Sequence, residues 1–209
     1  RVVQVSAGDH HSACITADGT LYTWGLERSG RLGRGRFTNS GSPQVGAAAA
    51  SGAPGGNSAA HPSSTTKGVL ITDGAFCVQP LAVHFFKRNR RTVQMVSCGA
   101  DHTLCIDDLA VAYAWGLGNY GALGLGDTRS IYRPTQIVLG NKGKSHAKST
   151  IKWTMVSAGA KHSIFLNDNG RVFSCGHGTN GRLGLGTQAG QLLPTNLIIR
   201  KHGVPIDPP

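Results

Sequence analysis

The stretch "GLGNYGALGLG", residues 116–126, has the residue types and spacing of a phosphate-binding loop. Its glycines Gly116, Gly118 and Gly121 spell G-x-G-x-x-G, the order that lets backbone amides approach a dinucleotide pyrophosphate at the start of a helix. Such a loop needs a preceding strand, a following helix and a single occurrence in the chain. The surrounding sequence therefore decides between a nucleotide site and a structural use of these glycines.

The chain repeats the segment that contains this stretch. Residues 5–35, 96–126 and 156–186 align without a gap, and the first copy reads "VSAGDHHSACITADGTLYTWGLERSGRLGRG". The third copy also spells G-x-G-x-x-G, from Gly176, whereas the first keeps only two of these glycines, beginning with Gly25. More glycines follow in every copy, which prevents a stable helix. The glycines are therefore predicted to form tight turns with positive φ, and we expect no nucleotide site and no cofactor.

Composition excludes several classes of protein. Of the 209 residues 30 are glycine, which suits a protein with many turns and disfavours a helical one. No apolar run approaches the roughly 20 residues of a membrane span, so no membrane-spanning segment is expected. The cysteines contain no C-x-x-C pair, which favours buried reduced thiols in an intracellular protein, nuclear or cytoplasmic, over a disulfide scaffold or metal site. They are Cys14, Cys77, Cys98, Cys105 and Cys175.

Each copy has the period-two alternation of β-strands. In the first copy Ala13 and Ile15 share one side of a strand, the turn "ADG" follows, and a return strand carries Trp24. The second copy has "DLA" at residues 108–110 and lacks the turn glycine, so its turn is predicted to differ. A further strand is expected near the proline that follows each glycine loop, and another ends at each "VS" pair. These prolines are Pro80, Pro134 and Pro194.

A unit of about four short strands cannot bury its own faces and must pack against the next unit. Radial repetition of four-stranded sheets is the β-propeller architecture. The predicted fold is all-β, a partial β-propeller of about three four-stranded blades that extends over residues 1–209. Its repeat units are residues 1–36 with 79–91, residues 92–141 and residues 152–200.

A low-complexity insertion interrupts the first unit. It covers residues 37–78, and its central tract, Gly46–Gly68, reads "GAAAASGAPGGNSAAHPSSTTKG". This composition offers almost nothing to bury, so the tract is predicted to be a disordered surface insertion.

The units "HSACITADGTLYTWG" with "SGRLGRG" and "HTLCIDDLAVAYAWG" with "YGALGLG" resemble the repeat of the regulator of chromosome condensation family. The match covers nearly the whole chain outside residues 37–78. Family members close rings of seven blades, so the resemblance implies that about three of seven are present. The family includes an exchange factor for the small GTPase Ran, ring domains of HECT-type ubiquitin ligases and scaffolds, and the sequence leaves these roles open.

The histidines at one repeat position are candidates for a structural or a functional role. His11, His102 and His162 are equivalent, and the structural interpretation is that each caps a strand and hydrogen-bonds backbone within its own blade. A structural role, in turns and in strand packing, is also assigned to the first glycine of each loop and to two tryptophans of the return strands. These residues are Gly25, Gly116, Gly176, Trp24 and Trp115.

The resemblance implies a second role for the neighbouring turn. In the family's exchange factor, acidic and histidine residues near this stretch face outward and meet the GTPase. By position, the candidates for contact with a partner here are Asp9, His10, Asp101 and His102, and Lys161 departs from the pattern. No catalytic residue is assigned, because no Ser/His/Asp set, paired carboxylates or metal cluster stands outside the repeat positions.

Basic residues gather in the connection between one unit and the next. Lys and Arg total 21 against 10 Asp and Glu, a formal charge of +11. Equivalent connections in a ring point to one face, so a basic face is predicted that binds an acidic surface: a nucleic-acid backbone, an acidic histone patch or an acidic tail. A solvated loop face without a ligand is the alternative. The residues are Lys87, Arg88, Arg90, Arg91, Lys142, Lys144, Arg200 and Lys201.

The sequence therefore predicts a non-enzymatic propeller scaffold that binds a macromolecular partner through this basic face. The alternative is a guanine nucleotide exchange factor for a Ran-like GTPase. Because three blades leave two open ends, we also expect another protein segment, from the rest of a ring or from a partner chain, to cover them.

Overall fold

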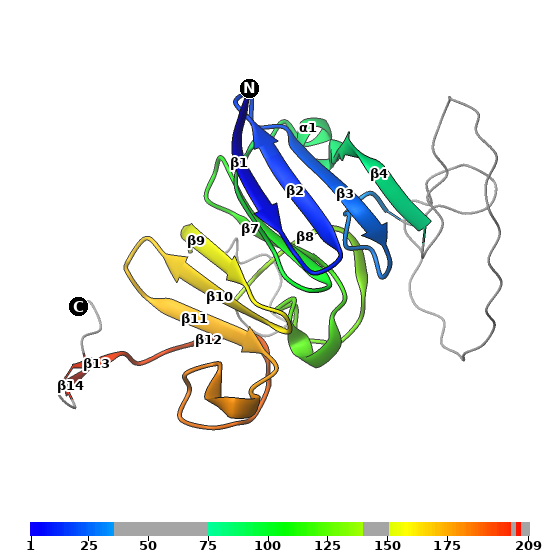
Figure 1. Ribbon diagram of the computed structural model, residues 1–209. Coiled ribbons are helices and arrows are strands. Elements are labelled where there is room, and N and C mark those ends of the chain that lie inside the picture. Colours follow the sequence, from blue (N-terminus) through cyan, green and yellow to red (C-terminus); the bar gives the residue numbers. More distant parts are fainter. Residues whose placement is uncertain (36–74, 140–150, 202–203, 206–209) are drawn as a thin grey trace, which may run out of the picture.

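The computed structural model of the chain describes residues 1–35, 75–139, 151–201 and 204–205 (Figure 1). Within these ranges the chain forms three four-stranded antiparallel sheets and one two-stranded ribbon. The first sheet, blade 1, comprises β1 (Val2–Ala7), β2 (His11–Thr16), β3 (Leu21–Glu27) and β4 (Ala75–Ala82). Blade 2 comprises β5 (Val93–Cys98), β6 (His102–Asp107), β7 (Ala112–Gly116) and β8 (Ile131–Gln136). Blade 3 comprises β9 (Trp153–Ala158), β10 (His162–Asn167), β11 (Val172–Gly176) and β12 (Gln191–Asn196), and β13 (Arg200–Lys201) pairs with β14 (Val204–Pro205).

The strands of each blade lie in sequence order, and the first strands of consecutive blades contact one another. Helices in the described part are short: α1 (His84–Arg88) and the 3-10 turns η1 (Asn119–Gly121) and η2 (Thr179–Gly181). The prediction of an all-β partial propeller is confirmed.

The fourth strand of blade 1 corrects the predicted insertion boundary. Leu81 pairs with Thr23 as Thr135 pairs with Ala114, which makes Pro80 the counterpart of Pro134. The pairing continues back to Ala75, so residues 75–78 belong to a strand rather than to the insertion. The reason is the extra length of β3, which offers backbone partners as far as its last residue. The Gly46–Gly68 tract lies outside the described residues.

The core lies between blades, because each strand directs alternate side chains to its two neighbours. Ala13 and Ile15 of blade 1 share a cluster with Tyr113 and Trp115 of blade 2. Leu104 and its neighbours on blade 2 pack in the same way against Trp153 and Phe165 of blade 3. Repetition of one interface therefore builds the core.

The outer faces of the end blades lack this cover within the described residues. Val5, Val96 and Val156 are equivalent, and they are 72%, 2% and 2% exposed. Trp24 of blade 1 is also less buried than its equivalent: Trp24 is half-buried, whereas Trp115 is fully buried. The exposed valine marks the face on which a preceding blade would pack.

The glycine loops form the predicted turns, but the hairpin of blade 2 differs from expectation. Gly25, Gly116 and Gly176 have φ of +112°, +108° and +108°. Ala110, predicted to belong to a different kind of turn, adopts φ +61° and donates its N–H to the Asp107 carbonyl as in the glycine turns. The Asp107 carboxylate accepts two further backbone N–H groups of this turn, as the Asn167 side-chain oxygen does in the turn of Gly170.

The antiparallel order divides the loops between two opposite ends of the blades. The "turn face" consists of the turns at residues 8–10, 99–101 and 159–161 together with the glycine loops. The "connection face" consists of the hairpin turns and the links between blades, such as residues 83–92. Backbone hydrogen bonds tie each set together: Leu117 N to the Asp101 carbonyl on the turn face, Asp108 N to the Thr92 carbonyl on the connection face.

Candidate functional site

A repeated hydrogen-bond relay joins neighbouring blades beneath the turn face. His11 Nε2 lies 2.8 Å from Thr103 Oγ1 of blade 2, and that hydroxyl donates to the Arg31 carbonyl at 2.9 Å. His102 Nε2 lies 2.9 Å from Ser163 Oγ of blade 3, and that hydroxyl donates to the Ala122 carbonyl. Each histidine thus reaches the following blade, whose hydroxyl returns to the glycine loop of the first. The expectation that these imidazoles bond backbone in their own blade is wrong, because the next blade supplies a closer polar group.

Burial fixes the charge state of the relay. Desolvation, with help from the Arg31 cation, lowers the pKa of His11 to about 3, and desolvation lowers the pKa of His102 to about 4. His102 is 1% exposed, so the sequence-predicted role of its side chain in contact with a partner gives way to a contact within the fold. His162, at the open end of blade 3, has a buried Nδ1 without a partner among the described residues.

Asp101 anchors the turn face by an ion pair across the same junction. Its Oδ1 lies 2.8 Å from Arg31 Nη2, and the two side chains are 32% and 3% exposed. Trp115 Nε1 donates to the Arg31 carbonyl, so one arginine is held by groups from blade 2 at both ends. The junction between blades 1 and 2 is filled in this way.

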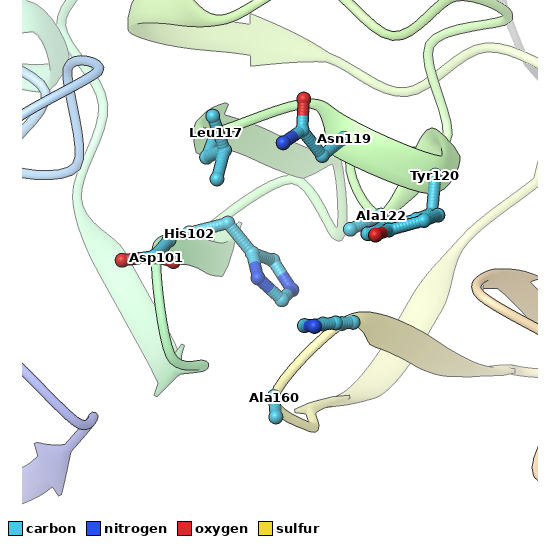
Figure 2. A pocket seen from close by; sticks show the side chains of 8 residues that line it. Asp101, His102, Leu117, Asn119, Tyr120, Ala122 and Ala160 are labelled. Atoms are coloured by element: carbon cyan, nitrogen blue, oxygen red, sulfur yellow. The ribbon is translucent and has the colours of Figure 1, made fainter.

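The junction between blades 2 and 3 instead contains a pocket of about 230 Å³ (Figure 2). Three of the five candidates for partner contact meet there: Asp101, His102 and Lys161. In Figure 2 the His102 ring points into the space and Asn119 overhangs it. The remaining lining residues are Leu117, Tyr120, Ala122 and Ala160.

The other two candidates stand apart from this pocket. Asp9 and His10 are exposed in the turn of blade 1 and do not line it. Sequence reasoning missed the other five lining residues, Leu117, Asn119, Tyr120, Ala122 and Ala160. For Ala122 a signal is present in the aligned copies, which carry Arg31 and Arg182 at this position.

The basic residues lie on the connection face, opposite the pocket. Lys87 and Arg88 end helix α1, and with Arg90 they are exposed. The buried ring of Phe86 packs edge-on against Tyr113, which fixes the helix to blade 2. Arg91 forms ion pairs with Asp107 and Asp108 at 3.7 and 3.9 Å. The predicted members Lys142 and Lys144 lie outside the described residues, and Arg200 and Lys201 form β13.

The described residues contain no group of three His, Cys, Asp or Glu side chains that could hold a metal ion. All five cysteines are buried and unpaired by disulfides, and burial raises the pKa of the Cys98 thiol to about 11. In the part of the chain that the structure describes, no helix has the length and apolarity of a membrane span.

Comparison with known proteins identifies the repeat. The profile of the regulator of chromosome condensation (RCC1) repeat matches residues 111–166 and 169–204, and a second profile of this repeat matches residues 2–31 and 154–182. The chain is 31% identical to human E3 ubiquitin-protein ligase HERC2, over 93% of the chain and 4% of the ligase. It is 30% identical to human Regulator of chromosome condensation, over 97% of the chain and 41% of that protein, and 31% identical to the Xenopus laevis protein, over 90% and 37%.

Solved structures show the same fold. Human WBSCR16 superposes with a TM-score of 0.65 at 20% identity, over 95% of this chain and 40% of that one. Prp20p from Saccharomyces cerevisiae, described with its binding to Gsp1p and histones, superposes with a TM-score of 0.65 at 19% identity, over 94% and 38%. The chain thus spans about two fifths or less of the length of these proteins. The repeated sequence, the three blades and these matches together show that the chain belongs to the regulator of chromosome condensation repeat family.

Proposed function

We propose that the chain is a non-enzymatic propeller scaffold that binds an acidic macromolecular partner through the connection face. The observation that carries this proposal is the group Lys87, Arg88 and Arg90. They are exposed on a short helix and its following turn, and no carboxylate of the described residues forms an ion pair with them. Exposed cations without an ion pair can form favourable electrostatic contacts with the phosphates or carboxylates of a partner. The formal charge of +11 adds a long-range attraction to such a partner.

The anchoring of α1 supports the proposal. Phe86 is 2% exposed and contacts the Tyr113 and Trp115 rings, so the cations project from a fixed segment. A fixed segment loses less conformational entropy on binding than a free loop does. The solved structure of Prp20p, a protein of this fold, is described with histones, which makes a chromatin component one acidic partner to test.

The test compares two charge-reversed variants with the same net charge. Lys87→Glu/Arg88→Glu alters the connection face, and Arg28→Glu/Arg129→Glu alters exposed residues of the glycine loops on the turn face, outside the pocket. Binding to a fluorescent 20-base-pair DNA duplex and to a polyglutamate peptide is measured at several salt concentrations. The proposal requires that the first variant weaken binding far more than the second and lower the salt slope by about one per lost phosphate contact. Equal losses of binding affinity in both variants would show that only the net charge matters, and this result would overturn the proposal.

Competition between the DNA duplex and the polyglutamate peptide then identifies the class of partner. If the partner is a nucleic acid, the DNA duplex should displace the bound peptide when both are present at equal concentrations of negative charge. If the partner is an acidic protein, the peptide should displace the DNA duplex under the same condition.

The second candidate function is nucleotide exchange on a Ran-like GTPase through the turn face. The specific observation in its favour is that Asp101, at the position expected from the family's exchange factor, is ordered at the mouth of a pocket and 32% exposed. Release of a fluorescent guanine nucleotide from Ran, with and without the chain, tests it. Acceleration that is lost in Asp101→Asn but kept in Lys87→Glu/Arg88→Glu would establish this function in place of the first. Release at the spontaneous rate would eliminate exchange by this chain.

A further inference from the structure

The pocket between blades 2 and 3 results from two residue exchanges at repeat-equivalent positions. Between blades 1 and 2, the Arg31 side chain is 3% exposed and pairs with Asp101 at 2.8 Å. Between blades 2 and 3, Ala122 stands in place of the arginine and Lys161 in place of the aspartate. The side chain that would fill the junction is therefore replaced by a methyl group. The acid that would receive it is replaced by a cation.

The charges around the pocket favour an anionic guest. Asp101 is committed to Arg31, and its carboxylate lies at the edge of the pocket toward blade 1 (Figure 2). His102 is neutral near pH 7, because burial lowers its pKa to about 4. The Lys161 ammonium lies 5.4 Å from the centre of the Tyr120 ring, and no carboxylate of the described residues forms an ion pair with it.

Tyr120 provides an apolar wall in an unusual backbone conformation. Its φ is +61°, in the left-handed region where bulky residues are rare, and the equivalent positions carry Ser29 and Asn180. The ring lies 4.2 Å from that of His177 and remains 46% exposed. The turn thus presents a large aromatic face to the pocket where the other blades have small polar residues.

We propose that this pocket receives one aspartate or glutamate side chain of a protein partner, with its carboxylate paired to Lys161. Its methylene groups would pack against Leu117 and Tyr120. The volume of about 230 Å³ lies below the roughly 300–1,000 Å³ of sites for drug-sized ligands, which suits a single side chain. A guest lysine or arginine would face the like charge of Lys161. This site lies on the turn face, opposite the basic surface of the proposed function. Experiments can therefore refute either proposal without affecting the other.

The test uses pentapeptides that are acetylated at the N-terminus and amidated at the C-terminus, with a central glutamate between glycines, and a glutamine peptide as the uncharged control. Two-dimensional NMR of the chain follows the backbone resonances of Asn119, Tyr120 and Ala160 during titration. The glutamate peptide is expected to shift these resonances saturably. The glutamine peptide is expected to bind about tenfold more weakly, since a hydrogen bond to a charged group contributes more than a neutral one. Equal affinity of the two peptides would overturn the proposal.

Two variants separate the site from general charge effects. Lys161→Gln is expected to weaken binding of the glutamate peptide about tenfold. Ala122→Arg/Lys161→Asp rebuilds the ion pair found between blades 1 and 2, so it should close the pocket and abolish binding while the chain remains folded in urea titrations. Lys152→Gln removes an exposed lysine from the link before β9 and should leave peptide binding unchanged. Peptide binding that survives in the refilled variant would refute the site.

Discussion

His11 of blade 1 and Thr103 of blade 2 meet at 2.8 Å, and their contact recurs at 2.9 Å between His102 and Ser163. In both places the hydroxyl also donates to a carbonyl of the glycine loop in the preceding blade. In blades 1 and 2, one histidine therefore couples a strand, the next blade and the loop that borders the turn face. Stability of the fold and geometry of the pocket depend on the same contacts.

Removal of the hydroxyl is expected to destabilise the chain. Thr103→Val keeps the shape of the side chain but leaves the buried His11 Nε2 without its partner and removes one of the two donors to the Arg31 carbonyl. The expected loss is about 1–3 kcal/mol in the free energy of unfolding, measured by urea denaturation. Ser12→Ala removes the equivalent hydroxyl of blade 1, which bonds no described residue, and should change stability by less than about 0.5 kcal/mol. Similar losses in the two variants would contradict an inter-blade role.

The lowered pKa values predict a loss of stability in mild acid. His11 and His102 have folded pKa values of about 3 and 4, below the ordinary value of 6.5. Between these values the unfolded chain binds more protons, so stability is fully present above pH 6.5 and falls as pH decreases toward 4. Each histidine contributes a slope of up to about 1.4 kcal/mol per pH unit.

Unfolding free energies at pH 7, 6 and 5 check this expectation. In His102→Gln the slope should decrease, because one of the three histidines whose pKa is lowered in the folded chain is gone. A slope unaffected by this substitution would show that other groups cause the pH dependence.

The turn at Ala110 offers a stabilising substitution. Ala110 adopts φ +61° where the other copies have Gly19 and Gly170 at +77° and +73°. An alanine in the left-handed region costs about 1–2 kcal/mol, and glycine removes this cost. Glycine also increases the conformational entropy of the unfolded chain, which offsets part of the gain. Ala110→Gly should therefore raise the free energy of unfolding by about 1 kcal/mol. A decrease on urea denaturation would mean that the turn has another conformation in solution.

Equivalent valines should respond differently to truncation. Val96 is 2% exposed between blades 1 and 2, whereas Val5 is 72% exposed. Val96→Ala should cost about 2–3 kcal/mol and Val5→Ala less than about 0.5 kcal/mol. Binding of a hydrophobic dye, reduced in Val5→Ala, would report the uncovered face directly. Equal costs would show that a second chain covers Val5 in solution, which sedimentation would then detect.

The sequence determined the features that arise locally. Period-two alternation specifies strands, a glycine such as Gly116 specifies positive φ, and repetition of both specifies blades that pack on one another. Counting strands would also have separated the two faces, because antiparallel order alternates the ends at which loops emerge. The turn at Ala110 escaped prediction because an alanine adopts the positive φ there, in a turn held by the same side-chain bonds as the turn of Gly170.

Only the tertiary structure decided which residues meet across blades. The partners of the relay are 92 and 61 positions apart, and no local rule links His11 with Thr103 or His102 with Ser163. The pocket has the same origin, because Ala122 and Lys161 define it only once two blades are packed together. Local preference acts through backbone sterics over a few residues, whereas a site between blades requires the packed core that brings distant loops into contact.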